Sequence, residues 1–210
     1  MSRRRYGQFC PLAKALDVLG ERWTLLVVRE LLAGPKRYTD LRAGLPGLAT
    51  DLLAARLREL QQAGVIGRRV VPPPTPATVY ELTERGRALR PVIRELSHWG
   101  RPLLLEPAED HLPDSALLLG LEVAFRPDAA AGLEETFDIE VDGKPVAVRV
   151  RDGTVDVTPG SAGDHASVKI VTDRQGFIDL ARGHAGDGVH IEGDADALAR
   201  LQRVFSLTYA

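Results

Sequence analysis

Residues 48–64, LATDLLAARLRELQQAG, carry the side chains with the clearest chemical potential. On a helix, Leu53, Leu57 and Leu60 form one apolar row that should face a core. The opposite row carries Asp51, Ala55 and Arg58, and Thr50 and Ala54 lie between the two faces. Arginine can donate to guanine, aspartate can accept from the amino group of cytosine, and threonine or alanine can meet the methyl group of thymine. The row could therefore read base edges in DNA.

This row is short of hydrogen-bond donors. Arg58 is its only strong donor, and the carboxylate of Asp51 would repel phosphate as well as accept from a base. We therefore expect part of the sequence recognition to come from the wing of the fold and from DNA shape.

Two further elements must position the row. Residues 37–47, RYTDLRAGLPG, predict a short helix with Leu41 and Leu45 inward, which ends at Pro46-Gly47. Two helices joined by such a tight turn form a helix-turn-helix, whose second helix can enter a DNA major groove. Downstream, VIGRRVV and TVYELT predict two strands around PPPTPA, and hence a hairpin. This order predicts a winged helix.

Four residues beside the reading helix are further candidate DNA contacts. Arg37 and Tyr38 lie at the entrance to the helix-turn-helix, where a solvated loop charge is the alternative. Arg68 and Arg69 point to opposite faces of their predicted strand, so at most one reaches DNA and the other should be a surface ion-pair partner. Because PPPTPA carries no charge, the wing is expected to contact phosphate rather than bases.

The charge of the chain is unevenly distributed. The 210 residues carry a net charge of −2, but residues 1–106 hold 18 Lys and Arg against 10 Asp and Glu, whereas residues 107–210 hold 9 against 19. A basic half suits phosphate contact, and an acidic half should lie away from DNA. We predict two domains, 1–106 and 117–210, joined by a linker at 107–116.

Two more helices flank the predicted winged helix. Cys10-Pro11 should begin the first helix, which places the thiol near the positive end of the helix dipole. Cys10 is thus a candidate sensor of oxidants or electrophiles, or a packing residue at a dimer seam. Thr83 should cap a long helix with an apolar stripe and a kink at Pro91.

The segments from Cys10 to Gly100 resemble the HxlR-type winged-helix transcriptional regulators, relatives of the MarR group. The matching segments are CPLAKALDVLGERWTLLVVRELLAGPKRYTDL, LLAARLRELQQAGVIGRRV and VYELTERGRALRPVIRELSHWG, in the order and spacing of the family. The resemblance implies a homodimer formed through the long helix and the first helix, with phosphate contact at Arg37 and Tyr38. Burial of the long helix under a second domain is the alternative. Some members of the family carry a reactive cysteine at the place of Cys10.

The second half of the chain predicts an α+β domain. Its five strand candidates are LLLGLEVAF, ETFDIEV, PVAVRV, TVDVTP and ASVKIVT, followed by the helices DRQGFIDLARG and DADALARLQRVFSL, with VHIEG between them. Residues 117–206 resemble the sterol-carrier-protein fold, which implies a sheet and helices around an apolar cavity. The candidate lining residues, for each of which ordinary core is the alternative, are Phe125, Phe137, Phe177, Leu180, Leu201 and Phe205.

Together these features predict a dimeric, ligand-responsive regulator that binds a pseudo-palindromic operator in double-stranded DNA. The alternative is a lipid or small-molecule carrier that uses the winged helix only for dimerisation. Hydrolase, phosphate-loop and dinucleotide motifs are absent, and the histidines show no metal spacing, so we expect no enzyme, cofactor or metal. No apolar run approaches the roughly 18–20 residues of a membrane span, and MSRRRYGQFC lacks a signal-peptide core, so a cytoplasmic location is expected.

Overall fold

The computed structural model describes residues 5–72, 76–103, 113–181, 188–193 and 195–205. The chain divides into two compact units, which are described separately below. The first comprises Met1–Leu96 with Glu106–Ala116, and the second comprises Ser97–Leu105 with Leu117–Ala210.

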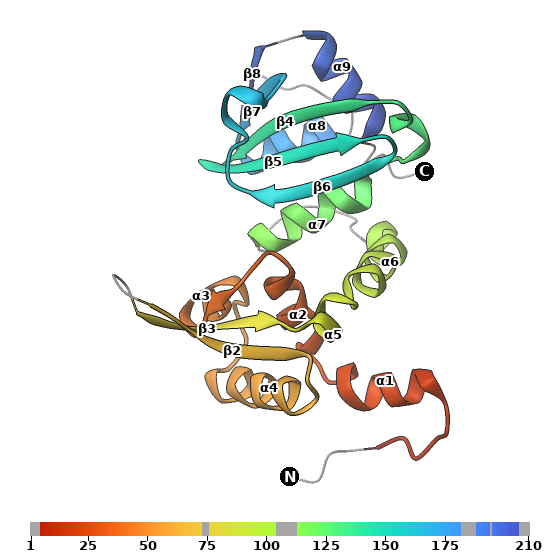
Figure 1. The fold of residues 1–210 in the computed structure, drawn as a ribbon, viewed down its shortest axis with the longest axis vertical. Coiled ribbons are helices and arrows are strands. Elements are labelled where there is room, and N and C mark those ends of the chain that lie inside the picture. Colours follow the sequence, from red (N-terminus) through yellow and green to blue (C-terminus); the bar gives the residue numbers. More distant parts are fainter. Residues whose placement is uncertain (1–4, 73–75, 104–112, 182–187, 194, 206–210) are drawn as a thin grey trace. The chain divides into compact units, whose positions relative to one another are not determined.

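The first unit is a winged helix, as predicted (Figure 1). Its three-stranded sheet has the order β1-β3-β2, and Figure 1 shows the hairpin of β2 and β3 projecting beyond the helices. Its elements are α1 (Pro11–Leu19), α2 (Thr24–Leu32), β1 (Lys36–Arg37), α3 (Tyr38–Gly44), α4 (Thr50–Gln62), β2 (Ile66–Val71), β3 (Ala77–Leu82), α5 (Glu84–Arg87) and α6 (Arg90–Gly100), the last of which crosses the boundary between the units.

The expected long helix is two helices. The Oγ of Thr83 accepts a hydrogen bond from the backbone N–H of Gly86 at 3.1 Å and caps α5, which ends at Arg87. Residues 88–89 form a turn before α6 begins at Arg90. The prediction of one continuous helix with a kink at Pro91 is therefore wrong. Proline has no N–H, and its ring clashes with the carbonyl four residues earlier, so Pro91 is tolerated only in the first turn of a new helix.

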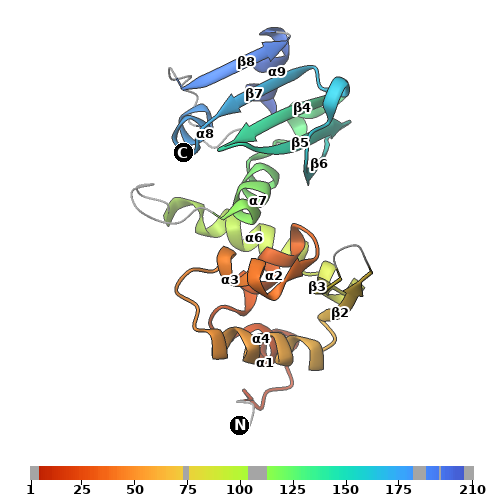
Figure 2. The same ribbon diagram turned by 90° about the vertical axis from the view of Figure 1, so that its left-hand side faces the viewer.

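The second unit is built on a five-stranded sheet in the order β6-β5-β4-β7-β8 (Figure 2). Strands β4 and β7 pair in parallel and the other neighbours are antiparallel. Helices α8 and α9 contact β7. The elements are η1 (Arg101–Leu103), α7 (Asp114–Ala124), η2 (Asp128–Ala130), β4 (Glu134–Val141), β5 (Lys144–Arg151), β6 (Thr154–Pro159), η3 (Gly163–His165), β7 (Val168–Thr172), α8 (Arg174–Ala181), β8 (Val189–Gly193) and α9 (Ala195–Val204). Helix α7 also crosses the boundary, because its first three residues, which include Ser115, belong to the first unit.

One predicted strand of this unit is a helix. Four of the five strand candidates are confirmed as β4 to β7, but residues 117–125 belong mainly to α7, which begins at Asp114 inside the predicted linker. A continuous apolar run does not distinguish a buried strand from a buried helix. Leucine and alanine favour the helix, and Asp114 suits its first turn. The expected linker residues 107–112 lie outside the described part of the chain, and VHIEG forms the edge strand β8.

No helix in the described residues combines the length and the apolar character that crossing a bilayer requires.

Candidate nucleic-acid interface

Helix α4 has the two faces that its sequence predicts. Leu53, Leu57 and Leu60 are 0–2% exposed and pack into the core of the first unit. On the opposite face, Asp51 and Arg58 are exposed to solvent. Figure 1 shows α4 on the outside of the first unit, beneath β2. The buried row holds the helix in place, and the outward row is available to a ligand.

The two outward charges of α4 are unpaired, whereas a third charge on the same helix is neutralised. Among the described residues, neither Asp51 nor Arg58 forms an ion pair. Arg56 is only 9% exposed; it contacts Glu21 through Nη2 at 3.2 Å and Glu59 through Nη1. Arg56 therefore holds α4 against the chain before α2, and the outward row keeps one free donor group and one free carboxylate.

Tyr38 joins the two helices of the helix-turn-helix. Its hydroxyl donates a hydrogen bond to the backbone carbonyl of Thr50 at 2.9 Å, which connects the first residue of α3 to the first residue of α4. Tyr38 is half-buried, and Thr50 is exposed. This contact fixes where the N-terminus of α4 stands relative to α3, so the predicted DNA-contact residue Tyr38 has a positioning contact within the protein.

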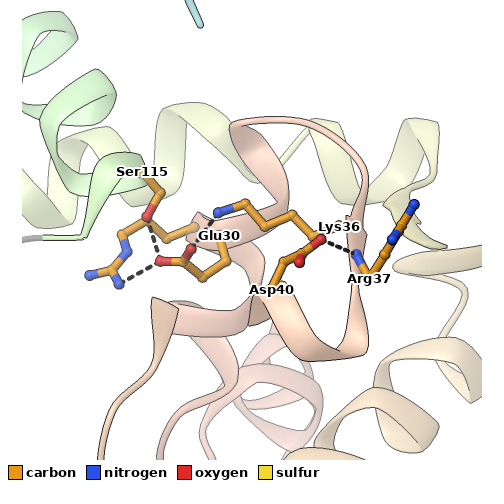
Figure 3. Close-up of polar contacts among 6 residues, drawn as sticks. Glu30, Lys36, Arg37, Asp40 and Ser115 are labelled. Carbon is orange, nitrogen blue, oxygen red and sulfur yellow. Dashed lines mark hydrogen bonds and ion pairs between the residues drawn. The ribbon is translucent and has the colours of Figure 1, made fainter. Parts of the chain in front are cut away.

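Arg37 is anchored by its backbone and leaves its side chain free. Its N–H donates to Oδ2 of Asp40 at 2.9 Å, which caps the start of α3. Figure 3 shows the guanidinium of Arg37 extending away from Asp40 and from the neighbouring Glu30. The side chain is exposed and has no ion-pair partner in the described residues. A cation held in this way at the entrance of the reading unit suits a phosphate oxygen.

The buried carboxylate of Glu30 binds the residues that lead into α3, and the sequence did not predict this contact. The side chain of Glu30 is 1% exposed; it accepts from Nη2 of Arg29 at 2.8 Å, from Nζ of Lys36 at 2.7 Å and from the Oγ of Ser115 (Figure 3). The contact with Lys36 ties β1, and hence the start of α3, to α2. Position 30 lies three residues after buried Val27, and this spacing was the available signal that Glu30 points inward.

The two arginines of the wing differ in their ion pairing. Nε of Arg69 lies 3.3 Å from both carboxylate oxygens of Glu81 on the neighbouring strand. Arg68 is exposed and forms no ion pair in the described part of the chain. Arg68 is therefore the wing arginine whose charge is available, and Arg69 is the ion-pair partner that the sequence led us to expect. The tip at 73–75 lies outside the described residues.

Cys10 stands at the N-cap of α1, as predicted. The thiol is free and half-buried, and no side-chain hydrogen bond caps the helix at this position.

The residues predicted to line a cavity fall into two groups. Phe137, Phe177 and Leu201 are 0–8% exposed in the core of the second unit. Phe125 and Phe205 are half-buried and contact each other, with ring centroids 5.5 Å apart. Leu180 lies in α8, but its side chain is outside the described part of the structure.

Comparison with known proteins gives the family of the first unit. Residues 18–107 match the model of the HxlR-like helix-turn-helix proteins. The chain is 41% identical over 94 residues to the uncharacterized HTH-type transcriptional regulator YvaP of Bacillus subtilis, a match that covers 44% of this chain and 87% of YvaP. It is 37% identical over 91 residues to the HTH-type transcriptional regulator YodB of the same organism, covering 43% of this chain and 81% of YodB.

A solved structure of reduced YodB aligns with a TM-score of 0.41 and 34% identity, over 49% of this chain and all of that one. These relatives are transcriptional regulators, which gives the alternative interpretation as a carrier no support. The two rows of α4 and the wing agree with these sequence matches. The chain therefore belongs to the HxlR-like helix-turn-helix family of transcriptional regulators.

Proposed function

We propose that the chain acts as a homodimer that binds a pseudo-palindromic operator through the outward face of α4. The observation that carries the proposal is the contrast on that helix: the leucine row is buried, while Asp51 and Arg58 are exposed and unpaired in the described residues. Arg37 and Arg68 would contact phosphates on either side, because both are exposed cations without an ion-pair partner in the same part of the chain.

Exposed apolar residues of the first unit support the dimer. Leu12 on α1 is 67% exposed, and Val92 and Leu96 on α6 are 52% and 48% exposed. Val92 and Leu96 are four residues apart, so they lie on one face of α6. Burial of this face against a second copy would remove its apolar surface from water. Two reading helices related by a twofold axis would meet half-sites roughly 34–36 Å apart.

A gel-shift titration of the full-length chain on DNA from its own promoter tests the proposal. We expect a specific complex at moderate salt, and weaker binding by the Arg37→Ala, Arg58→Ala double variant. Absence of a specific band, or equal binding by this variant and the parent, would contradict the proposed interface.

We further propose that Cys10 makes the regulator responsive to oxidants or electrophiles. YodB, the relative described above, has been solved in quinone-bound and diamide-treated forms. Cys10 is the only cysteine of this chain, and its side chain is half-buried at a helix N-cap. Diamide treatment should change the DNA affinity of the parent and leave that of Cys10→Ser unchanged. An equal response of both proteins would assign the effect to another group.

For the second unit we propose binding of a hydrophobic effector by a sterol-carrier-like domain. The sheet with α8 and α9 against β7, and the apolar side chains of Phe137, Phe177 and Leu201 in its core, support this assignment. An effector regulates only if its affinity differs between the states that bind and release DNA. Mass spectrometry of the protein purified under native conditions should reveal an apolar ligand that dissociates on unfolding. Its addition should shift the DNA affinity.

A further inference from the structure

We propose that α4 recognises two G·C base pairs about three base pairs apart. Asp51 would accept a hydrogen bond from the amino group of a cytosine, and Arg58 would donate to the O6 and N7 atoms of a guanine. The methyl groups of Ala54 and Ala55 would face the base pairs between them, where they fit the methyl group of thymine. This inference rests on the proposed function, since it specifies what the outward face of α4 reads.

The spacing of the two charges sets the distance between the two base pairs. Asp51 and Arg58 are seven residues apart, which brings them to within about 20° of each other around the helix and about 10.5 Å apart along its axis. Successive base pairs rise by about 3.4 Å, so this separation spans about three of them. The recognition helix of a helix-turn-helix reads bases from its N-terminal residues, and Asp51 lies in the first turn of α4.

The chemistry of the two side chains sets the bases. A carboxylate only accepts hydrogen bonds, and cytosine offers the N4 amino donor. Adenine also offers an amino group, but its N7 acceptor stands beside that group and would repel the carboxylate. Arginine only donates, and guanine presents two adjacent acceptors to it. Asp51 therefore selects a G·C pair through its cytosine, and Arg58 selects another through its guanine.

In the described part of the chain, every other charged group of α4 is already held in an ion pair. Arg56 is neutralised by Glu21 and Glu59, as described above. The half-buried Ala54 and Ala55 lie between Asp51 and Arg58 and contribute only methyl groups. The carboxylate of Asp51 repels phosphate at every site and so weakens nonspecific binding. A hydrogen bond from cytosine offsets this repulsion, so the cost is recovered only at sites that place a cytosine there.

Selection of binding sites from a pool of random duplexes tests this inference with the full-length chain. The parent should select a half-site with G·C pairs at two positions about three base pairs apart. Asparagine makes a bidentate contact with adenine, so Asp51→Asn should change the preferred pair at one of these positions from G·C to A·T. Arg58→Ala should lose the preference at the other position, where discrimination is expected to fall by roughly five- to a hundredfold. Glu84→Gln removes an exposed acid from α5 and is the matched control, which should keep the parental site.

The outcomes separate this inference from the proposed function. If no duplex is enriched by the parent, the proposed DNA binding is wrong. If the parent enriches a defined site and Asp51→Asn selects the same bases at every position, DNA binding stands and the assignment of Asp51 is wrong. A site in which the two sensitive positions are adjacent, or more than about five base pairs apart, would contradict the placement of both residues on one face of α4.

Replacement of thymine by uracil between these positions should weaken binding, because it removes the methyl groups that Ala54 and Ala55 would meet.

Discussion

The carboxylate of Glu30 lies so close to Gly44 that a Cβ atom at position 44 would stand 2.5 Å from its Oε2 atom. Gly44 is the last residue of α3, and Glu30 is the buried acid of α2 that binds Lys36. The glycine is thus required by the approach of α3 to an ion pair, rather than by its own backbone angles. The position of the helix-turn-helix therefore depends on the polar contacts of Glu30 as well as on its buried leucines.

Gly44→Ala should destabilise the first unit by about 1–3 kcal/mol, because the added methyl group must displace a side chain held by three partners. Gly100→Ala is the matched control: Gly100 also ends a helix, and an added Cβ would meet no atom within 4 Å. The control should be unchanged or slightly more stable, by up to about 1 kcal/mol. Urea denaturation measures both. Equal effects of the two substitutions would contradict the close approach of Glu30.

Glu30→Ala should cost about 3–5 kcal/mol, since it leaves the cations of Arg29 and Lys36 without their buried partner. Glu81→Ala removes the partner of Arg69 at the exposed wing and should cost less than about 1 kcal/mol. The chain has two tryptophans, so a Trp99→Phe background lets the fluorescence of Trp23 report on the first unit alone. A cost for Glu30→Ala no greater than that for Glu81→Ala would show that the buried pair contributes little.

Two neighbouring arginines of the wing should differ in their contribution to DNA binding. Arg68→Ala should lower the slope of log K against log salt by about 0.9, the change expected for one lost phosphate contact. Arg69→Ala should leave the slope nearly unchanged, because Glu81 already neutralises Arg69. Fluorescence anisotropy at several salt concentrations gives both slopes. A larger change for Arg69→Ala would reverse the assignment of the two faces of β2.

Substitution of Val92 and Leu96 by aspartate should convert the dimer to a chain of 22.8 kDa in sedimentation experiments. Two charges on the shared apolar face would have to be buried without partners, and this cost opposes association. Ile191→Asp places a charge on an exposed apolar position of β8 in the second unit, and it should leave the mass unchanged. If the parent itself sediments as a single chain at micromolar concentration, the proposed dimer is wrong.

The sequence predicted the reading helix well because one periodicity decided it. Leu53, Leu57 and Leu60 recur at helical spacing, and burial of these three residues settles the orientation of α4 and so exposes Asp51 and Arg58. The same periodicity could not show that Arg56 turns back onto Glu21, since that contact joins residues 35 positions apart.

Other features depended on contacts that a local pattern does not contain. The apolar residues 117–124 fit a strand or a helix equally well until their neighbours are known, and they form α7. The two-residue strand β1 exists only because Lys36 pairs with Tyr80 and Arg37 with Val79 of β3. The burial of Glu30 likewise depends on contacts outside its own helix. An acid inside a helix suggests exposure, and its three partners come from α2, β1 and α7.

Sequence-specific DNA binding is tested most directly by comparing the affinity of the full-length chain for its selected duplex with its affinity for a scrambled duplex of the same composition, at about 0.15 M salt. We predict two chains per selected duplex and an affinity at least about a thousandfold higher than for the scrambled one. Equal affinities for the two duplexes would contradict sequence-specific reading by α4.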